Sequence, residues 1–327
     1  MKKILNFWKV AEYAALCLLL YAAVLLAVNR RYQLAVTAGI ELWAAAILPA
    51  LFPYLVITTL VSALGIIGDV AKVFSPFAKR TFNVSGNVFY AFTVSLISGY
   101  PVGAKTVSDL KNGGFIGETE SVRAAALCSS ASPVFLIGSV GNITFNSPFF
   151  GLCLFITHVI SVVVTGFVFS FYKRGERPAV DSPVALKRSE NLLYDGVSSA
   201  VVSVLVVGGI ITLFYLLTEM LAGAGVLGII SDFINLFIGD KTVSTGIAAG
   251  FFECTKGIKI IAGKGINVFT LPITASLVGF GGLSVIAQSL AFLNKAKIKT
   301  APFLLSKTLA AIISFSVGLI FSLIFFA

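Results

Sequence analysis

The sequence has few of the residues that enzymes use for acid, base or metal chemistry. Only 12% of its 327 residues are charged, and His158 is the only histidine. It contains no nucleophile elbow, no HExxH motif, no Walker A lysine motif and no pair of carboxylates at a credible active-site spacing. With so little equipment for proton transfer, the sequence predicts a protein that is not an enzyme and needs no cofactor.

Cysteine is equally sparse. The four cysteines are far apart and include no CxxC pair, which argues against a disulfide framework or a zinc motif. We interpret them as small apolar packing residues. His158 is interpreted as a packing residue or as a partner in a hydrogen bond between helices. No metal site is predicted.

What is abundant is apolar sequence. Hydrophobic residues make up 57% of the chain and the mean hydropathy is +0.99. Several runs reach the roughly 20 residues that cross a bilayer as a helix. A β-barrel would show short alternating segments instead. The sequence therefore predicts an all-α polytopic protein of the cell membrane, in contact with the lipid bilayer. The clearest runs are 11–28, 149–171, 196–222 and 302–326.

The formal charge of +10 does not indicate a nucleic-acid partner. The basic residues lie in short loops between apolar runs and form no continuous stripe, which is typical of topology signals. The N-terminus looks like a signal peptide, but Asn29, Arg30 and Arg31 follow its apolar part where a small-residue cleavage site would stand. We therefore expect residues 1–32 to form an uncleaved transmembrane helix.

Two apolar stretches are interrupted in ways that a bilayer tolerates only around a protected cavity. The first is SGYPVGAK, at residues 98–105, which predicts a re-entrant hairpin within 84–118. The second is SSASP, at 129–133, which predicts that the helix over 121–142 is discontinuous.

Similar breaks recur in the second half of the chain. An offset of 151 residues places Gly99 opposite Gly250 and Lys105 opposite Lys256. The same offset maps SSASP onto FGGLS at 280–284. We therefore predict two repeats preceded by the N-terminal helix. Their ranges are 33–172 for the first repeat, 173–190 for a polar cytoplasmic linker and 191–327 for the second repeat.

Counting basic residues predicts that the repeats are inverted. With the N-terminus inside, fourteen lysines and arginines fall in inside loops and only Arg30, Arg31 and Lys241 fall outside, leaving aside those in or just after the hairpins and Lys307 in a span. The first repeat then begins outside and the second inside. Inverted repeats with broken helices place a substrate near the membrane midplane.

The hairpins have the means to bind a small anion. Glycines let backbone amides approach a ligand, a restarting helix offers its positive end, and Lys105 and Lys256 add full charges. A lysine that reaches the headgroups beside a glycine packing motif is the competing interpretation. Glu253 is predicted to pair with Lys256, to bind a coupling ion or to carry a proton. The candidate substrate-binding residues are Ser98, Gly99, Tyr100, Gly103, Lys105, Thr106, Ser129, Ser130, Ser132, Gly250, Glu253, Thr255, Lys256, Gly281 and Gly282.

These stretches resemble a known family. The runs LWAAAILPALFPYLVIT, SGYPVGAK with its DLKNGG tail, ALCSSASPVFLIGSVG, FFECTKGI and GFGGLSV look like the sporulation integral membrane protein YlbJ family, whose halves carry the nucleoside recognition or Gate domain. The resemblance covers nearly the whole chain after the first helix. It implies a membrane protein of endospore-forming bacteria that is linked to spore maturation and to movement of dipicolinate across a forespore membrane.

The sequence thus predicts a transporter that moves a small organic anion, such as a dicarboxylate, by alternating access. Two alternatives stay open: a nucleoside-type transporter, which the Gate domain implies by remote kinship, and a membrane scaffold of a sporulation complex that transports nothing. The identity of a coupling ion, proton or sodium, and assembly as a homo-oligomer also stay open.

Overall fold

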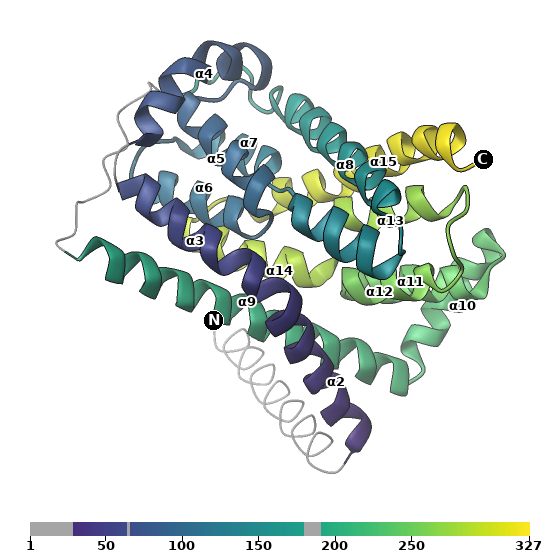
Figure 1. Cartoon of the computed structure of the whole chain (residues 1–327). Helices are drawn as coiled ribbons and strands as arrows, with labels where there is room; N and C mark the ends of the chain where they lie inside the picture. Colours follow the sequence, from purple (N-terminus) through teal and green to yellow (C-terminus); the bar gives the residue numbers. More distant parts are fainter. Residues whose placement is uncertain (1–28, 64–65, 180–190) are drawn as a thin grey trace, which may run out of the picture.

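A computed structural model of the chain describes residues 29–63, 66–179 and 191–327 (Figure 1). Within these ranges every regular element is helical, which confirms the all-α prediction. The predicted N-terminal helix lies outside the described residues, except for its last residues from Asn29 onward. Most of the predicted linker, from 180 to 190, also lies outside them.

The first half of the chain forms one long helical stretch, a short helix, a helical hairpin, a broken helix and a straight span. Its elements are α2 (Arg30–Leu42), the π-helical segment η1 (Trp43–Ile47), α3 (Leu48–Ala63), α4 (Ile66–Phe82), α5 (Gly86–Ser98), α6 (Val102–Asn112), α7 (Glu118–Leu127), the π-helical segment η2 (Val134–Thr144) and α8 (Pro148–Phe169).

The second half repeats this order, with a long helix, a short helix, a hairpin, a broken helix and a straight span. Its elements are α9 (Leu192–Gly223), α10 (Val226–Ile238), α11 (Lys241–Phe252), α12 (Cys254–Ala262), α13 (Thr270–Phe280), α14 (Gly282–Leu293), the short 3-10 segment η3 (Asn294–Ala296) and α15 (Thr300–Phe325).

The long helices of the two halves run side by side in opposite directions (Figure 1). Near the start of α2, Arg31 forms an ion pair with Glu219 near the end of α9. Further along, the indole Nε1 of Trp43 donates to the carbonyl of Val204, which lies earlier in α9. Residue numbers therefore rise along one helix as they fall along the other.

The last spans of the two halves are paired in the same antiparallel way. Ser161 of α8 donates its hydroxyl to the carbonyl of Ala310 in α15 at 2.9 Å. At the other end, the rings of Phe149 and Phe325 lie 5.6 Å apart. Equivalent helices of the two halves thus point in opposite directions, which is the arrangement that inverted repeats produce.

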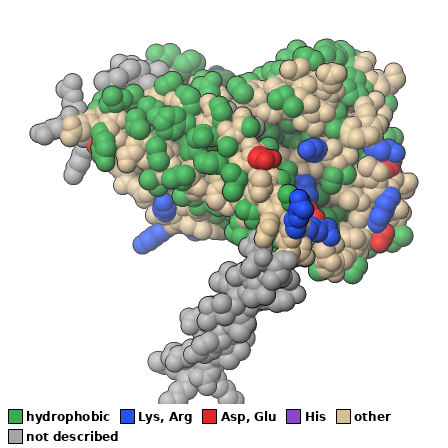
Figure 2. Space-filling view, turned by 60° about the horizontal axis from the view of Figure 1, so that its bottom comes forward, with side chains coloured by type: hydrophobic (Ala, Val, Ile, Leu, Met, Phe, Trp, Pro, Cys, Tyr) green, Lys and Arg blue, Asp and Glu red, His purple; other side chains and the backbone are tan. Residues whose placement is uncertain are grey.

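Hydrophobic side chains cover much of the molecular surface, with basic side chains gathered mainly in one part of the face shown in Figure 2. Large apolar residues such as Phe167, Phe233 and Ile320 are exposed, as expected where lipid is the solvent. The chain is a multi-pass membrane protein. Four helical stretches among the described residues are long and apolar enough to cross a bilayer: Pro148–Phe169, Leu192–Gly223, Thr270–Ala296 and Thr300–Phe325.

The breaks fall where glycine, proline or a capping side chain lets a new helix begin. In the first hairpin, α5 ends at Ser98 and α6 begins at Val102; in the second, Glu253 alone separates α11 from α12. The offset of 151 residues is therefore wrong for the hairpins, because its partner for Gly99, Gly250, lies inside α11. The turn forms instead at Glu253, whose side chain caps α12. Capping preference is a local property that a hydropathy pattern does not show.

Topology is tested directly by cysteine accessibility. We expect a cysteine at Gly175, in the exposed turn after α8, to react from the cytoplasmic side, and a cysteine added after Ala327 to react from the opposite side. If the hairpin returns to its own side, each half crosses the membrane an odd number of times. The two positions stand before and after the second half, so they should lie on opposite sides. Labelling of intact and permeabilised cells measures this, and reaction of both positions from one side would rule out the inverted arrangement.

Candidate functional site

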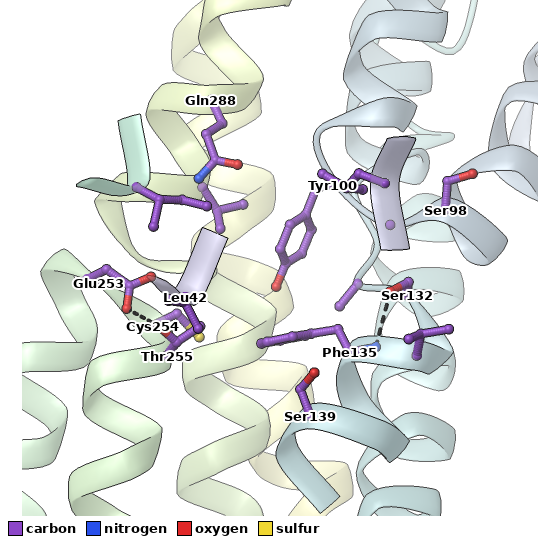
Figure 3. Close-up of a pocket in the computed structure, with 16 residues that line it drawn as sticks. Leu42, Ser98, Tyr100, Ser132, Phe135, Ser139, Glu253, Cys254, Thr255 and Gln288 are labelled. Atoms are coloured by element: carbon purple, nitrogen blue, oxygen red, sulfur yellow. Dashed lines mark hydrogen bonds between the residues drawn. The ribbon is translucent and has the colours of Figure 1, made fainter. Parts of the chain in front are cut away.

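A narrow cavity of about 60 Å³ lies where both hairpin tips and both broken helices meet (Figure 3). Its volume is below the roughly 300 to 1,000 Å³ of open small-molecule sites, so the structure shows this cavity nearly closed. The wall is mainly apolar, with a few polar groups that converge on it. Six of the sequence-predicted residues line it: Ser98, Gly99, Tyr100, Ser132, Glu253 and Thr255. Further lining side chains include Leu42, Leu51, Phe135, Ser139, Ile211, Cys254, Val285 and Gln288.

The first hairpin tip is built around Gly99. Its φ of +82° lies in the left-handed region that favours glycine, and its amide donates to the carbonyl of Ser95 at 2.8 Å, which ends α5. A Cβ at this position would stand 2.7 Å from the backbone nitrogen of Ser132. The first tip therefore packs directly on the broken helix of its own half. This close approach carries Tyr100 into the cavity (Figure 3).

The second hairpin tip presents a buried carboxylate. Glu253 is 3% exposed and lies at the first turn of α12, where it accepts the backbone N–H of Lys256 at 2.8 Å and the hydroxyl of Thr255. This is helix capping, and it places a negative charge at the positive end of α12. Glu253 and Thr255 face the cavity from the side opposite Ser132 and Phe135 (Figure 3).

The structure does not bring the two predicted lysines together. Lys105 pairs with Asp109, one turn further along α6, at 3.0 Å. Lys256 pairs with Glu219 of α9 at 2.7 Å rather than with Glu253. The two ammonium groups therefore lie outside the cavity between the tips. That their charges contribute to anion binding stays a prediction.

Lys256 lies instead on a second, more open cavity of about 510 Å³. Arg30, Arg31, Tyr215 and Glu219 also line it. Three cationic side chains against one carboxylate make this opening positive, which favours the approach of anions. Because Lys256 directly follows Thr255 in α12, the open cavity and the cavity between the tips share the first turn of that helix.

Serine side chains bind the backbone groups that the break after α7 sets free. The Ser95 hydroxyl donates to the carbonyl of Cys128 at 2.8 Å and accepts the amide of Ser130 at 3.2 Å. Ser132 accepts the amide of Phe135 at 3.2 Å and so caps η2. Sequence reasoning named Ser130 and Ser132 but missed Ser95, whose role depends on how α5 packs against the break.

Two buried polar residues on the long spans were also missed as site residues. His158 of α8 accepts the amide of Ala131 at its Nε2, at 2.9 Å. Lys307 of α15 donates to the hydroxyl of Ser129 at 3.2 Å and lies 5.2 Å from the centre of the Tyr100 ring. The available signal was a lysine within an apolar span, since such charges are kept for a use.

The remaining predicted residues support the site rather than line it. Gly103 packs against the broken helix, and Thr106 returns its hydroxyl to the carbonyl of Val102 at 3.0 Å. Gly250 packs against Gly257 within the second hairpin and against Leu277 of α13. The break of the second half uses Gly281 and Gly282, with φ of +83° and +70°.

Comparison with known proteins gives one informative relative. No family model matches the chain, and no solved structure matches it. The chain is 27% identical over 299 residues to the sporulation integral membrane protein YlbJ of Bacillus subtilis (strain 168). The matched region covers 84% of this chain and 73% of that protein.

Proposed function

Because this chain belongs to the YlbJ family of sporulation integral membrane proteins, we propose that it transports a small organic anion across a membrane during spore formation. A dicarboxylate such as dipicolinate is the substrate that the proposal favours, and a forespore membrane is the proposed location. The observation that carries the proposal is the convergence of two hairpin tips and two helix breaks on one cavity. Transporters built from inverted repeats bind their substrates at such breaks.

The contacts of the hairpin tips support alternating access. The Tyr100 hydroxyl of the first tip approaches the carbonyl of Val278, at 3.4 Å, near the end of α13 in the second half. The second tip packs in turn against the first half, where Cys254 and Ile258 share an apolar cluster with Leu136. Each tip therefore seals against the other half. Rocking of one half against the other would open one seal while the second stays closed.

The positive entrance favours an anion, whereas the cavity wall favours a nucleoside-type substrate as the second candidate. The rings of Tyr100 and Phe135 offer flat apolar surfaces, while Glu253 and Gln288 offer hydrogen-bonding groups. Aromatic faces beside an acid and an amide suit a nucleobase. A carboxylate inside the cavity also repels a dianion unless a proton neutralises one of them.

Ligand-dependent thermal stabilisation separates these candidates. The purified protein would be melted with dipicolinate, with uridine and with adenosine, since only a ligand that binds the folded state raises the melting temperature. The proposal expects stabilisation by dipicolinate. Stabilisation by a nucleoside alone would favour the alternative substrate, and no response to any of them would favour a scaffold that transports nothing.

Substitutions of Lys256 and Lys105 form a matched pair that tests the proposed binding of an anion. Replacing Lys256 by glutamine should weaken apparent affinity for dipicolinate about tenfold, because a charge-assisted contact is worth roughly 1.5 kcal/mol or more. Lys105→Gln is the control, since its ammonium pairs with Asp109 away from both cavities. Equal losses in the two variants would mean that the lysines only set a general positive potential.

A further inference from the structure

Lys307 is a buried cation that the proposed transport does not yet use. Its side chain projects from the first third of α15 and is only 1% exposed. The ammonium donates to Ser129 Oγ at 3.2 Å and lies over the ring of Tyr100. No carboxylate forms an ion pair with it in the part of the chain that the structure describes. Burial of a charge without a counter-ion is costly, and packing alone gives no reason to keep it.

The ammonium lies between the C-terminal ends of two half-helices. Ser129 follows the end of α7 by two residues, at the break of the first half. The second end is that of α13, which is capped by Gly281, where a Cβ would stand 3.6 Å from the Lys307 nitrogen. Helix C-termini carry partial negative charge, so these two ends supply the counter-charge that no carboxylate provides.

Glu253 shows the complementary arrangement at the neighbouring break. Its carboxylate lies at the N-terminal end of α12, which carries partial positive charge. Each of the two buried charges therefore lies at helix ends of the opposite sign: Lys307 at C-terminal ends and Glu253 at an N-terminal end. The ring of Tyr100 lies against the ammonium, and Tyr100 lines the cavity together with Glu253.

In transporters with broken helices, the C-terminal ends of half-helices and nearby oxygens are where the coupling cation binds. Here that position contains a covalently attached ammonium. We infer that the Lys307 ammonium permanently occupies the cation site at the two helix breaks. The protein therefore keeps its hairpin tips in place and binds its substrate without a sodium ion. The statement about substrate rests on the proposed transport; the statement about the cation site does not.

The cation site can be tested without any substrate. Lys307→Ala deletes the ammonium and leaves space for a small cation, whereas Lys307→Met deletes the charge and fills the space. We expect methylammonium to raise the melting temperature of Lys307→Ala by about 2 to 4 °C relative to tetramethylammonium at equal ionic strength. The Lys307→Met variant and the parent should not respond. An equal response of both variants, or none in a folded Lys307→Ala, would overturn the inference.

Sodium independence is tested on the parent protein, which removes the risk that a variant does not fold. Its melting temperature and its affinity for dipicolinate should agree within about twofold in sodium chloride and in choline chloride, because no sodium site is left to fill. A sodium-specific increase in either quantity would contradict the inference. If no ligand binds the parent in any salt, the proposed transport fails, while the methylammonium experiment still decides the cation site.

Discussion

Replacing Gly103 by alanine is expected to destabilise the protein by about 3 kcal/mol, at the upper end of the cost of overpacking, and to abolish ligand binding. A Cβ at Gly103 would stand 2.0 Å from the carbonyl oxygen of Cys128 and 2.5 Å from Ser95 Oγ. Neither atom is free to move, because the Ser95 hydroxyl donates to that same carbonyl at 2.8 Å. The added methyl group must therefore push α6 away from the helix break. Thermal unfolding in detergent measures the loss.

Gly117→Ala is the matched control for this substitution. Gly117 precedes α7, has φ of −80°, and has no atom within 4 Å of the place where a Cβ would stand. Alanine should therefore leave its melting temperature close to that of the parent. If the two variants melted at the same temperature, the close contact between the first hairpin and the break would not exist in the folded protein.

Replacing Glu253 by glutamine is expected to remove the pH dependence of anion binding. A carboxylate in the cavity and a bound dianion repel each other, so the anion should bind together with a proton on Glu253. Between pH 6 and 8, where free carboxyl groups are ionised, parent affinity should then fall by up to about tenfold per pH unit as pH rises. Glutamine mimics the protonated acid and should bind with nearly constant affinity. Titration of ligand binding across this pH range measures both slopes.

Glutamine also keeps the fold intact, which makes the comparison fair. Its side-chain oxygen still accepts the Lys256 amide that Glu253 accepts at 2.8 Å. Glu253→Ala removes this cap and should cost about 1 kcal/mol of stability in addition. A steep pH dependence that persists in Glu253→Gln would assign the proton to another group and would remove Glu253 from the coupling mechanism.

The sequence contained enough to predict the first hairpin tip and the helix break that line the cavity, but not the partners of the charged side chains. Gly99 and the serines at 129–132 favour helix breaks through their local backbone preferences. The hairpin and the broken helix could therefore be predicted from short stretches of sequence. The pairing of Lys105 with Asp109 is also local, one turn apart on a helix. Lys256 pairs with Glu219, 37 residues away, because α9 passes that hairpin, and no pattern in the sequence specifies that packing.

Lys307 shows why the remaining part of the site was missed. A lysine in a long apolar helix can reach the headgroups along its own stem, and hydropathy treats it as a minor interruption. What gives it a role is the pair of helix ends around it, one of them from the other half of the chain. Contacts between the halves become visible only once both are folded against each other.

The antiparallel pairing of α8 and α15 has an energetic consequence. In a molecule with two identical halves, exchange of their conformations would convert the inward-facing state into an outward-facing state of equal free energy. This chain is not identical in its halves, because the residue 151 positions before Lys307 is the exposed, apolar Ile156. The buried charge belongs to one half alone, so under the proposed alternating access the two states would differ in free energy and in population at rest. Under the proposed transport, the resting protein would then be biased toward one side of the membrane, whichever anion is its substrate.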